Sequence, residues 1–193
     1  MSPKSTKVVL PKLEWRESPN HSERSPGIVP YLIVAHRPVG KYHGSADWLC
    51  NRRAQASAHV LTEGNGTGVD EATQLVRWDK KAWACASFNS ASYNIEVDDN
   101  AWDGTDPDAL RVAARIFAFI CFKTGIPPVQ SKHPLHDPGI VRHIELGRAG
   151  GGHTDPTEDV ALWRSFIKMV DKELRHAGFR KTWGRGSFKR IDV

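Results

Sequence analysis

The chain has 193 residues, which suits a single domain, and 39% of them are apolar, a low but ordinary share for a globular protein. The formal net charge is +5 and the pI is about 9.2, so the composition favours an anionic partner, such as nucleic acid, a membrane surface or a cell-wall polymer. No apolar stretch is long enough to span a bilayer, so stable membrane insertion is not expected. The odd number of cysteines, three without Cys-x-x-Cys spacing, argues against a disulfide framework.

The apolar patterns along the chain predict alternating strands and helices. Residues 1–27 are polar, contain four prolines and are expected to form an extended arm. Strands are predicted at residues 27–36, 57–63, 73–78 and 92–99, with a short strand or extended segment at 140–146, and a turn at 64–68. Along the segment 92–99, Ile95 and Val97 should lie on one face and Asn94 and Glu96 on the other.

Three helices are expected, and two of them carry clear terminal signals. The helix at 106–125 begins with Asp106 before Pro107 and ends at Gly125, and its centre is apolar nearly all round. The helix at 157–178 is amphipathic, with a stripe formed by Val160, Trp163, Ile167, Val170 and Leu174. A shorter helix at 45–55 would use Ser45 as its N-cap. This alternation predicts a three-layer α/β domain.

Two histidines occupy the ends of apolar segments predicted as strands. His36 ends the segment 27–36, and His143 follows the apolar start of 140–146, with Asp155 twelve residues later beyond a glycine-rich stretch. Imidazole nitrogens and a carboxylate oxygen are suitable zinc ligands, and three protein ligands leave a fourth position for water, as in catalytic sites. A histidine bonded within a neighbouring loop is the alternative interpretation of each residue alone.

Glu96 lies on the polar face of its predicted strand. A carboxylate in such a place can act as a general base toward a metal-bound water. The alternative is a surface glutamate on a half-exposed strand.

Five segments, taken together and in order, resemble the zinc-dependent N-acetylmuramoyl-L-alanine amidases of the amidase-2 type, whose fold is shared with peptidoglycan recognition proteins. The segments are "YLIVAHRP", "SAHVL", "AWACASFNSASYNIEV", "GIPPV" with "GIVRHIEL", and "HTDP", and "SPNHSERS" is similar to phage lysins of this group. The resemblance covers residues 18 to about 178. It implies a central mixed β-sheet flanked by helices in three layers.

The resemblance also implies roles for particular residues. His36, His143 and Asp155 match the zinc ligands, and Glu96 matches the catalytic glutamate. His153 matches a position that stabilises the developing oxyanion, and its role here would depend on its protonation or on a donated hydrogen bond. The matches to positions that line the substrate groove are Trp83 and Asn89.

The chain departs from the family pattern at three places. Cys85 stands where the family often has histidine, and Ala58 stands where some members have tyrosine, which makes Glu96 the more important base. The stretch from His143 to Asp155 is slightly longer than in many relatives.

Other clusters are weaker candidates. His133, His136 and Asp137 lie in "HPLHDPG", where Pro134 prevents a helix that would place both histidines on one face, so a polar rim is expected there. His59 is expected beside the site or in the core. The stretch from Gly147 to Gly152 lacks a following Gly-Lys-Ser/Thr, which argues against a phosphate-binding loop.

The resemblance thus implies zinc-dependent hydrolysis of the amide bond between N-acetylmuramic acid and L-alanine in bacterial peptidoglycan. We expect an extended arm at 1–27, a catalytic domain at 28–178 and a basic tail at 179–193, in a monomer that binds no nucleic acid. Because "MSPKSTKVVLPKLEW" lacks a signal-peptide pattern, a phage endolysin made in the cytoplasm and released to the wall is expected. The alternatives are a non-catalytic peptidoglycan-binding module of the same fold and a basic nucleic-acid-binding protein.

Overall fold

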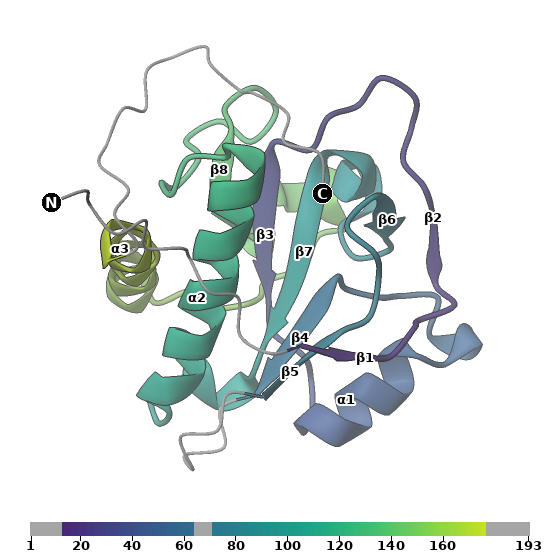
Figure 1. Cartoon of the computed structure of the whole chain (residues 1–193), viewed down its shortest axis with the longest axis horizontal. Coiled ribbons are helices and arrows are strands. Elements are labelled where there is room, and N and C mark those ends of the chain that lie inside the picture. The colour runs from purple at the N-terminus through teal and green to yellow at the C-terminus, as the bar shows by residue number, and fades with distance from the viewer. Residues whose placement is uncertain (1–12, 64–70, 177–193) are drawn as a thin grey trace, which may run out of the picture.

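The computed structural model describes residues 13–63 and 71–176, which form a mixed β-sheet with helices on both faces (Figure 1). The six strands lie in the order β1-β5-β4-β7-β3-β8. Their bounds are β1 Glu14–Trp15, β5 Glu71–Gln74, β4 Val60–Glu63, β7 Ser92–Val97, β3 Leu32–His36 and β8 Gly139–Arg142. Only β4 and β5 pair antiparallel in this sheet, and the other neighbours are parallel. The predicted fold class is confirmed.

The described residues form two long α-helices and several shorter helices. The α-helices are α1 (Tyr42–Leu49), α2 (Pro107–Thr124) and α3 (Val160–His176), and the 3-10 helices are η1 (Arg52–Ala54), η2 (Ala86–Ala91), η3 (Asp99–Ala101) and η4 (His143–Gly150). A separate antiparallel pair joins β2 (His21–Glu23) to β6 (Lys80–Ala82). None of the helices in the described residues is long and apolar enough to cross a membrane.

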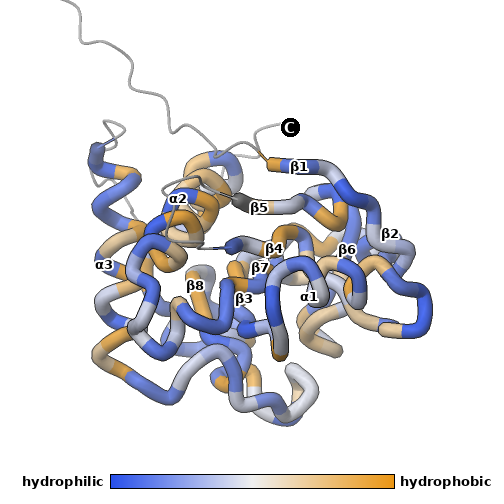
Figure 2. Tube along the Cα trace, turned by 90° about the horizontal axis from the view of Figure 1, so that it is seen from below, coloured by the Kyte–Doolittle hydropathy of each residue, from blue (hydrophilic) through white to orange (hydrophobic). Residues whose placement is uncertain are grey.

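The two faces of the sheet have different partners. Ile33 and Ala35 of β3, together with Ile95 of β7, pack in the same core cluster as α2 and α3. Side chains alternate along a strand, so Leu32, Val34 and His36 point to the opposite face. Figure 2 shows hydrophobic stretches in α2 and the central strands and hydrophilic stretches in the surrounding loops. The two long helices therefore lie on one face of the sheet, and the other face, which α1 and the short helices η2 and η4 partly cover, carries His36.

The terminal signals of α2 act as the sequence predicts. The side chain of Asp106 accepts hydrogen bonds from the backbone N–H groups of Asp108 and Ala109, and Pro107 is the first helical residue. Gly125 ends the helix with a φ of 76°, in the left-handed region that favours glycine. The helix is buried over most of its surface, which fixes the face of the sheet available for a site.

Several predicted boundaries are wrong. Helix α1 begins at Tyr42 rather than at Ser45. Tyr42 is buried and its hydroxyl is hydrogen-bonded to Thr73 Oγ1 at 2.5 Å, and these contacts hold an additional helical turn before Ser45 against the sheet. Helix α3 begins at Val160, whose side chain is exposed, although Trp163, Val170 and Leu174 are buried as the stripe predicts. The predicted turn at 64–68 and the basic tail lie outside the described residues.

The segment predicted as an extended arm contributes two strands. In its described part, β1 pairs with β5 at the sheet edge and β2 pairs with β6. Between them, Asn20 Nδ2 donates hydrogen bonds to the carbonyls of Asn51 and Ala56, at 2.8 and 3.0 Å. Residues 13–27 are thus extended, and they are tied to the domain by backbone and side-chain bonds.

Candidate metal and amidase site

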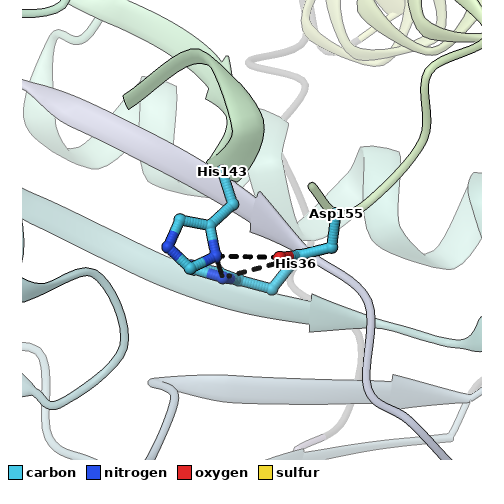
Figure 3. A group of neighbouring side chains, drawn as sticks. All are labelled: His36, His143 and Asp155. Carbon is cyan, nitrogen blue, oxygen red and sulfur yellow. Dashed lines mark hydrogen bonds and ion pairs between the residues drawn. The ribbon is translucent and has the colours of Figure 1, made fainter. Parts of the chain in front are cut away.

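Three predicted ligands, His36, His143 and Asp155, converge at the ends of β3 and β8 (Figure 3). His36 Nδ1 lies 3.0 Å from His143 Nδ1 and 3.6 Å from Asp155 Oδ2, and His143 Nδ1 lies 3.0 Å from Asp155 Oδ1. Both histidines are 3% exposed. Among the described residues this is the one group of His, Cys, Asp and Glu side chains that is arranged to hold a metal ion.

The backbone explains how residues so distant in sequence meet. His36 is the last residue of β3 and His143 directly follows β8, and the carboxyl ends of these neighbouring parallel strands lie at one edge. The N–H of Ile144 donates to the carbonyl of Asp155 at 2.9 Å, which ties the loop of Asp155 to η4. The N–H of Arg37 donates to Asp155 Oδ2 at 3.2 Å, which orients the carboxylate. The chain does not continue as a strand to residue 146, as predicted, because η4 starts at His143.

The hydrogen bonds on the far sides of the two rings fix their tautomers. His36 Nε2 lies 3.0 Å from Asn94 Oδ1, and His143 Nε2 lies 2.8 Å from the carbonyl of Gly150. A carbonyl oxygen only accepts, so each neutral ring must carry its hydrogen on Nε2 and leave a lone pair on Nδ1. Both lone pairs face each other and the carboxylate, which is the arrangement that a cation satisfies.

The electrostatics of the cluster lead to the same conclusion. Burial lowers the pKa of His36, and the opposing effect of Asp155, which favours the charged ring, does not outweigh it. Burial alone would raise the pKa of Asp155, but the two imidazoles outweigh it and hold that pKa below its usual range. The aspartate is therefore charged beside two imidazoles, of which His36 resists protonation. The donor set of two nitrogens and one carboxylate oxygen fits zinc.

Glu96 stands beside this cluster on β7. In the parallel ladder it is the register partner of His36, so both side chains leave the same face of the sheet. Its Oε2 atom is enclosed and has no hydrogen-bond partner among the described residues. Burial, and secondly the negative charge of Asp155, raises the pKa of Glu96 to about 8. A carboxyl group with this pKa can both accept and donate a proton near neutrality.

His153 lies over the cluster on its exposed side. Its ring is stacked on that of His143, with centroids 4.6 Å apart and an interplanar angle of 18°, and its Nδ1 lies 3.9 Å from Asp155 Oδ1. The side chain is 61% exposed, so a ligand arriving from solvent can reach it. A cavity of about 440 Å³ opens beside Asp155, lined by Arg37, Val39, Asp99, Thr154, Asp155, Pro156, Thr157 and Glu158.

The side chains of Trp83 and Asn89 form hydrogen bonds with nearby parts of the chain. Trp83 Nε1 donates to Ser22 Oγ at 3.0 Å, which fastens the indole to β2. Asn89 Oδ1 accepts from the backbone N–H groups of Ala84 and Cys85, at 3.0 and 2.7 Å. Neither is among the described residues that line the cavity beside Asp155. In this structure both side chains hold the segment before β7 in shape.

Sequence reasoning missed Asn94, which orients His36. Its Oδ1 accepts from His36 Nε2 and from the Cys85 thiol at 3.2 Å, while its Nδ2 donates to Ser92 Oγ at 3.0 Å. Burial raises the pKa of Cys85 to about 12, so the thiol keeps its hydrogen and remains a donor. The sequence does contain one indication of this role, because Asn94 is a polar residue on the same strand face as Glu96.

The other candidate histidines lie elsewhere. His59 is fully buried, accepts a hydrogen bond from the Asn94 N–H at Nδ1, and has a pKa lowered to about 3, chiefly by burial and then by Arg24. His133 and His136 are exposed in the loop before β8, where their backbones form a turn. Within the described residues, neither histidine nor Asp137 joins the metal cluster.

Solved structures with this fold are found among proteins of low sequence identity. The crystal structure of the Staphylococcus aureus hydrolase AmiA in complex with its ligand superposes with a TM-score of 0.70 at 17% identity, covering 86% of this chain and 84% of that one. The PlyG catalytic domain superposes with a TM-score of 0.62 at 16% identity, covering 84% and 95% of the two chains. At these identities the likeness shows the fold.

Sequence comparison then gives the family. The family model described as N-acetylmuramoyl-L-alanine amidase matches residues 26–158. N-acetylmuramoyl-L-alanine amidase A of Achromobacter lyticus is 33% identical over 149 residues, which cover 72% of this chain and 82% of that protein. The chain belongs to the N-acetylmuramoyl-L-alanine amidase family. The predicted family and its amidase activity are thereby confirmed.

Proposed function

We propose that this chain is a zinc-dependent amidase that cuts the bond between the lactyl group of N-acetylmuramic acid and the L-alanine of the stem peptide in bacterial peptidoglycan. The observation that carries the proposal is the convergence of two Nδ1 lone pairs and the Asp155 carboxylate at 3.0 to 3.6 Å. His36, His143 and Asp155 would hold the ion. Zinc, when bound, supplies a Lewis acid and lowers the pKa of water.

Glu96 is proposed as the general base and then the general acid. Burial raises the pKa of Glu96, and a nearby cation would favour its charged form, so the group can take a proton from the attacking water and return it to the leaving amine of L-alanine. The same group serves both steps because no other carboxylate shares the strand face beside His36 within β7.

His153 is proposed to stabilise the oxyanion that develops on the carbonyl oxygen. Its exposed ring stacks on His143 and is thereby held beside the cluster, where one ring N–H can donate to the substrate. The cavity beside Asp155 provides room for part of the substrate next to the proposed ligand Asp155. Trp83 and Asn89 are proposed to shape the groove indirectly, through the backbone that they hold.

The test combines metal content with product analysis. Purified wild type should contain one zinc per chain, and His143→Ala should lose it, whereas the control His136→Ala, in the exposed loop, should keep it. Wild type incubated with peptidoglycan should release muropeptides with new L-alanine amines, and a chelator should stop this release until zinc is restored. Zinc retained by His143→Ala would refute the ligand assignment, and binding without new amines would favour a non-catalytic module.

A biological role as a phage endolysin is proposed as well, in a monomer made in the cytoplasm and released to the cell wall. Its supports are the net charge of +5, which attracts an anionic wall, and the lysin-like segment "SPNHSERS". Added to bacterial cells with a permeabilised outer surface, the protein should clear the suspension, and Glu96→Gln should not. Gel filtration checks the monomer.

A further inference from the structure

A second cavity lies at the edge of the sheet formed by β1 and β5. Its volume is about 550 Å³, and its lining residues are Trp15, Gln74, Arg77, Trp78 and Asp79. In the strand order, β1 and β5 are the two strands furthest from β8, whose end leads to His143 (Figure 1). The cavity shares no lining residue with the one beside Asp155.

The strand register places this cavity on the opposite face of the sheet from the metal cluster. Trp15 pairs with Gln74 and Gln74 pairs with Val60, and Val60 packs under α2. Residues paired across neighbouring strands share a face, so Trp15 and Gln74 lie on the α2 side. His36 and Glu96 leave the other side. A ligand in the second cavity therefore does not occupy the amidase site.

The two tryptophans provide rigid aromatic surface in this cavity. Trp15 is 48% exposed, and the guanidinium carbon of Arg77 lies 5.7 Å from its ring centroid. Trp78 is half-buried and stacks on the buried His59, with centroids 5.8 Å apart and an interplanar angle of 5°. Tryptophan combines a large apolar face with an N–H donor, which suits a ligand that has both apolar and polar edges.

The polar groups around the rings indicate the charge of the ligand. Gln74 offers an amide, Arg77 a guanidinium and Asp79 a carboxylate, so the charges of the lining residues cancel. A phosphate-bearing polymer requires an excess of positive charge at its site. An uncharged ligand with C–H faces and many hydroxyl or acetamide groups fits both the rings and these donors and acceptors. Saccharides have this chemistry.

We propose that the Trp15–Trp78 cavity binds the amino-sugar glycan strand of peptidoglycan, apart from the amidase site. The proposal rests on the proposed function for the identity of the polymer. Because the two sites lie on opposite faces, they engage different segments of the wall. The cavity thus retains the enzyme on the insoluble polymer and adds nothing to the cleavage of a small soluble substrate.

The binding experiment uses the full chain, kept in chelator so that no turnover occurs. Sedimentation with insoluble peptidoglycan, and titration with an oligomer of N-acetylglucosamine followed by NMR, measure the affinity. Trp15→Ala should weaken both by roughly tenfold, the loss expected for a central aromatic contact. Trp48→Ala is the matched control, because Trp48 is 55% exposed on α1 and outside the cavity. Asp79→Ala, at a side chain 70% exposed, provides a second variant that spares the fold.

The outcomes separate this proposal from the amidase proposal. With zinc present, Trp15→Ala and wild type should cleave a soluble muramoyl-peptide equally. If Trp15→Ala and Asp79→Ala both bind the polymer and the oligomer as well as Trp48→Ala does, the glycan site is refuted whatever the activity. If wild type fails to cleave the soluble substrate while the binding differences persist, the amidase proposal fails and the saccharide site stands.

Discussion

The Nδ1 atoms of His36 and His143 lie 3.0 Å apart, and their outer nitrogens, the Nε2 atoms, are both engaged with carbonyl oxygens. Two lone pairs at this distance repel each other unless a cation or a proton lies between them. A cation held between the two nitrogens and the Asp155 carboxylate removes this repulsion, which links metal binding to stability.

Zinc is therefore expected to stabilise the folded chain. At a free zinc concentration about 100 times its Kd, the free energy of unfolding should rise by about 2.7 kcal/mol. His36→Ala should abolish the effect, and the exposed-loop variant His136→Ala should preserve it. Thermal or urea unfolding of the chelated protein with and without added zinc makes the measurement. Equal stabilisation of His36→Ala by zinc would show that the ion binds elsewhere.

Replacement of Asn94 should weaken metal binding without removing a ligand. Asn94→Leu deletes the acceptor that holds the hydrogen on His36 Nε2, so zinc affinity should fall roughly 10- to 100-fold. Asn94→Asp keeps an acceptor oxygen and should retain most of the affinity. Competition with a chromophoric chelator gives both values. An unchanged affinity in Asn94→Leu would mean that packing alone orients the ring.

Glu96 should make the metal-free protein less stable as the pH rises. Its carboxyl pKa is raised from 4.5 to about 8 in the folded state, so the folded chain binds that proton more tightly than the unfolded chain. The stability that this proton contributes is complete below about pH 4.5 and is lost as the pH rises through 8. The amide of Glu96→Gln does not titrate, so its free energy of unfolding should rise relative to that of wild type as the pH increases across this window. The rise should be at most about 5 kcal/mol.

Unfolding of both proteins in chelator from pH 4.5 to 9 measures the difference. A constant gap between the two would contradict a raised pKa. Added zinc should narrow the gap, because a nearby cation favours the charged carboxylate.

Gly150 should tolerate no side chain. An added Cβ would lie 2.4 Å from the Cβ of Leu146, within η4, and the Gly150 carbonyl is the acceptor for His143 Nε2. Gly150→Ala should therefore cost about 1–3 kcal/mol of stability and weaken zinc binding together. Gly44→Ala is the control, because nothing lies within 4 Å of a Cβ there and α1 should gain slightly. If both alanine variants unfold alike, η4 is looser than its contacts indicate.

Local signals in the sequence predicted the parts of the fold that short-range chemistry determines. The Asp106 cap, the Gly125 end and the alternation along β7 depend on neighbouring residues, and all are present in the structure. The start of η4 was missed because it depends on the side chain of Glu145, whose Oε2 accepts from the Arg142 N–H and turns the chain at His143.

The site itself was only partly accessible to sequence reasoning. Strand ends suggested His36 and His143, whereas the place of Asp155 follows from long-range bonds to Arg37 and Ile144 that no spacing reveals. The role of Asn94 required knowing which strands are neighbours, since its partners His36 and Cys85 come from other segments.

The pairing of His36 with Glu96 across β3 and β7 has a consequence for variation in this fold. Their separation is set by a backbone ladder, so lengthening or shortening the surrounding loops leaves it unchanged. Asp155 lies outside the strand ladder, in the loop after η4, and is held by single hydrogen bonds from Ile144 and Arg37. Insertions in this loop should therefore weaken metal binding before they affect the position of His36 relative to Glu96. Engineered variants that carry new loops should leave residues 151–156 intact.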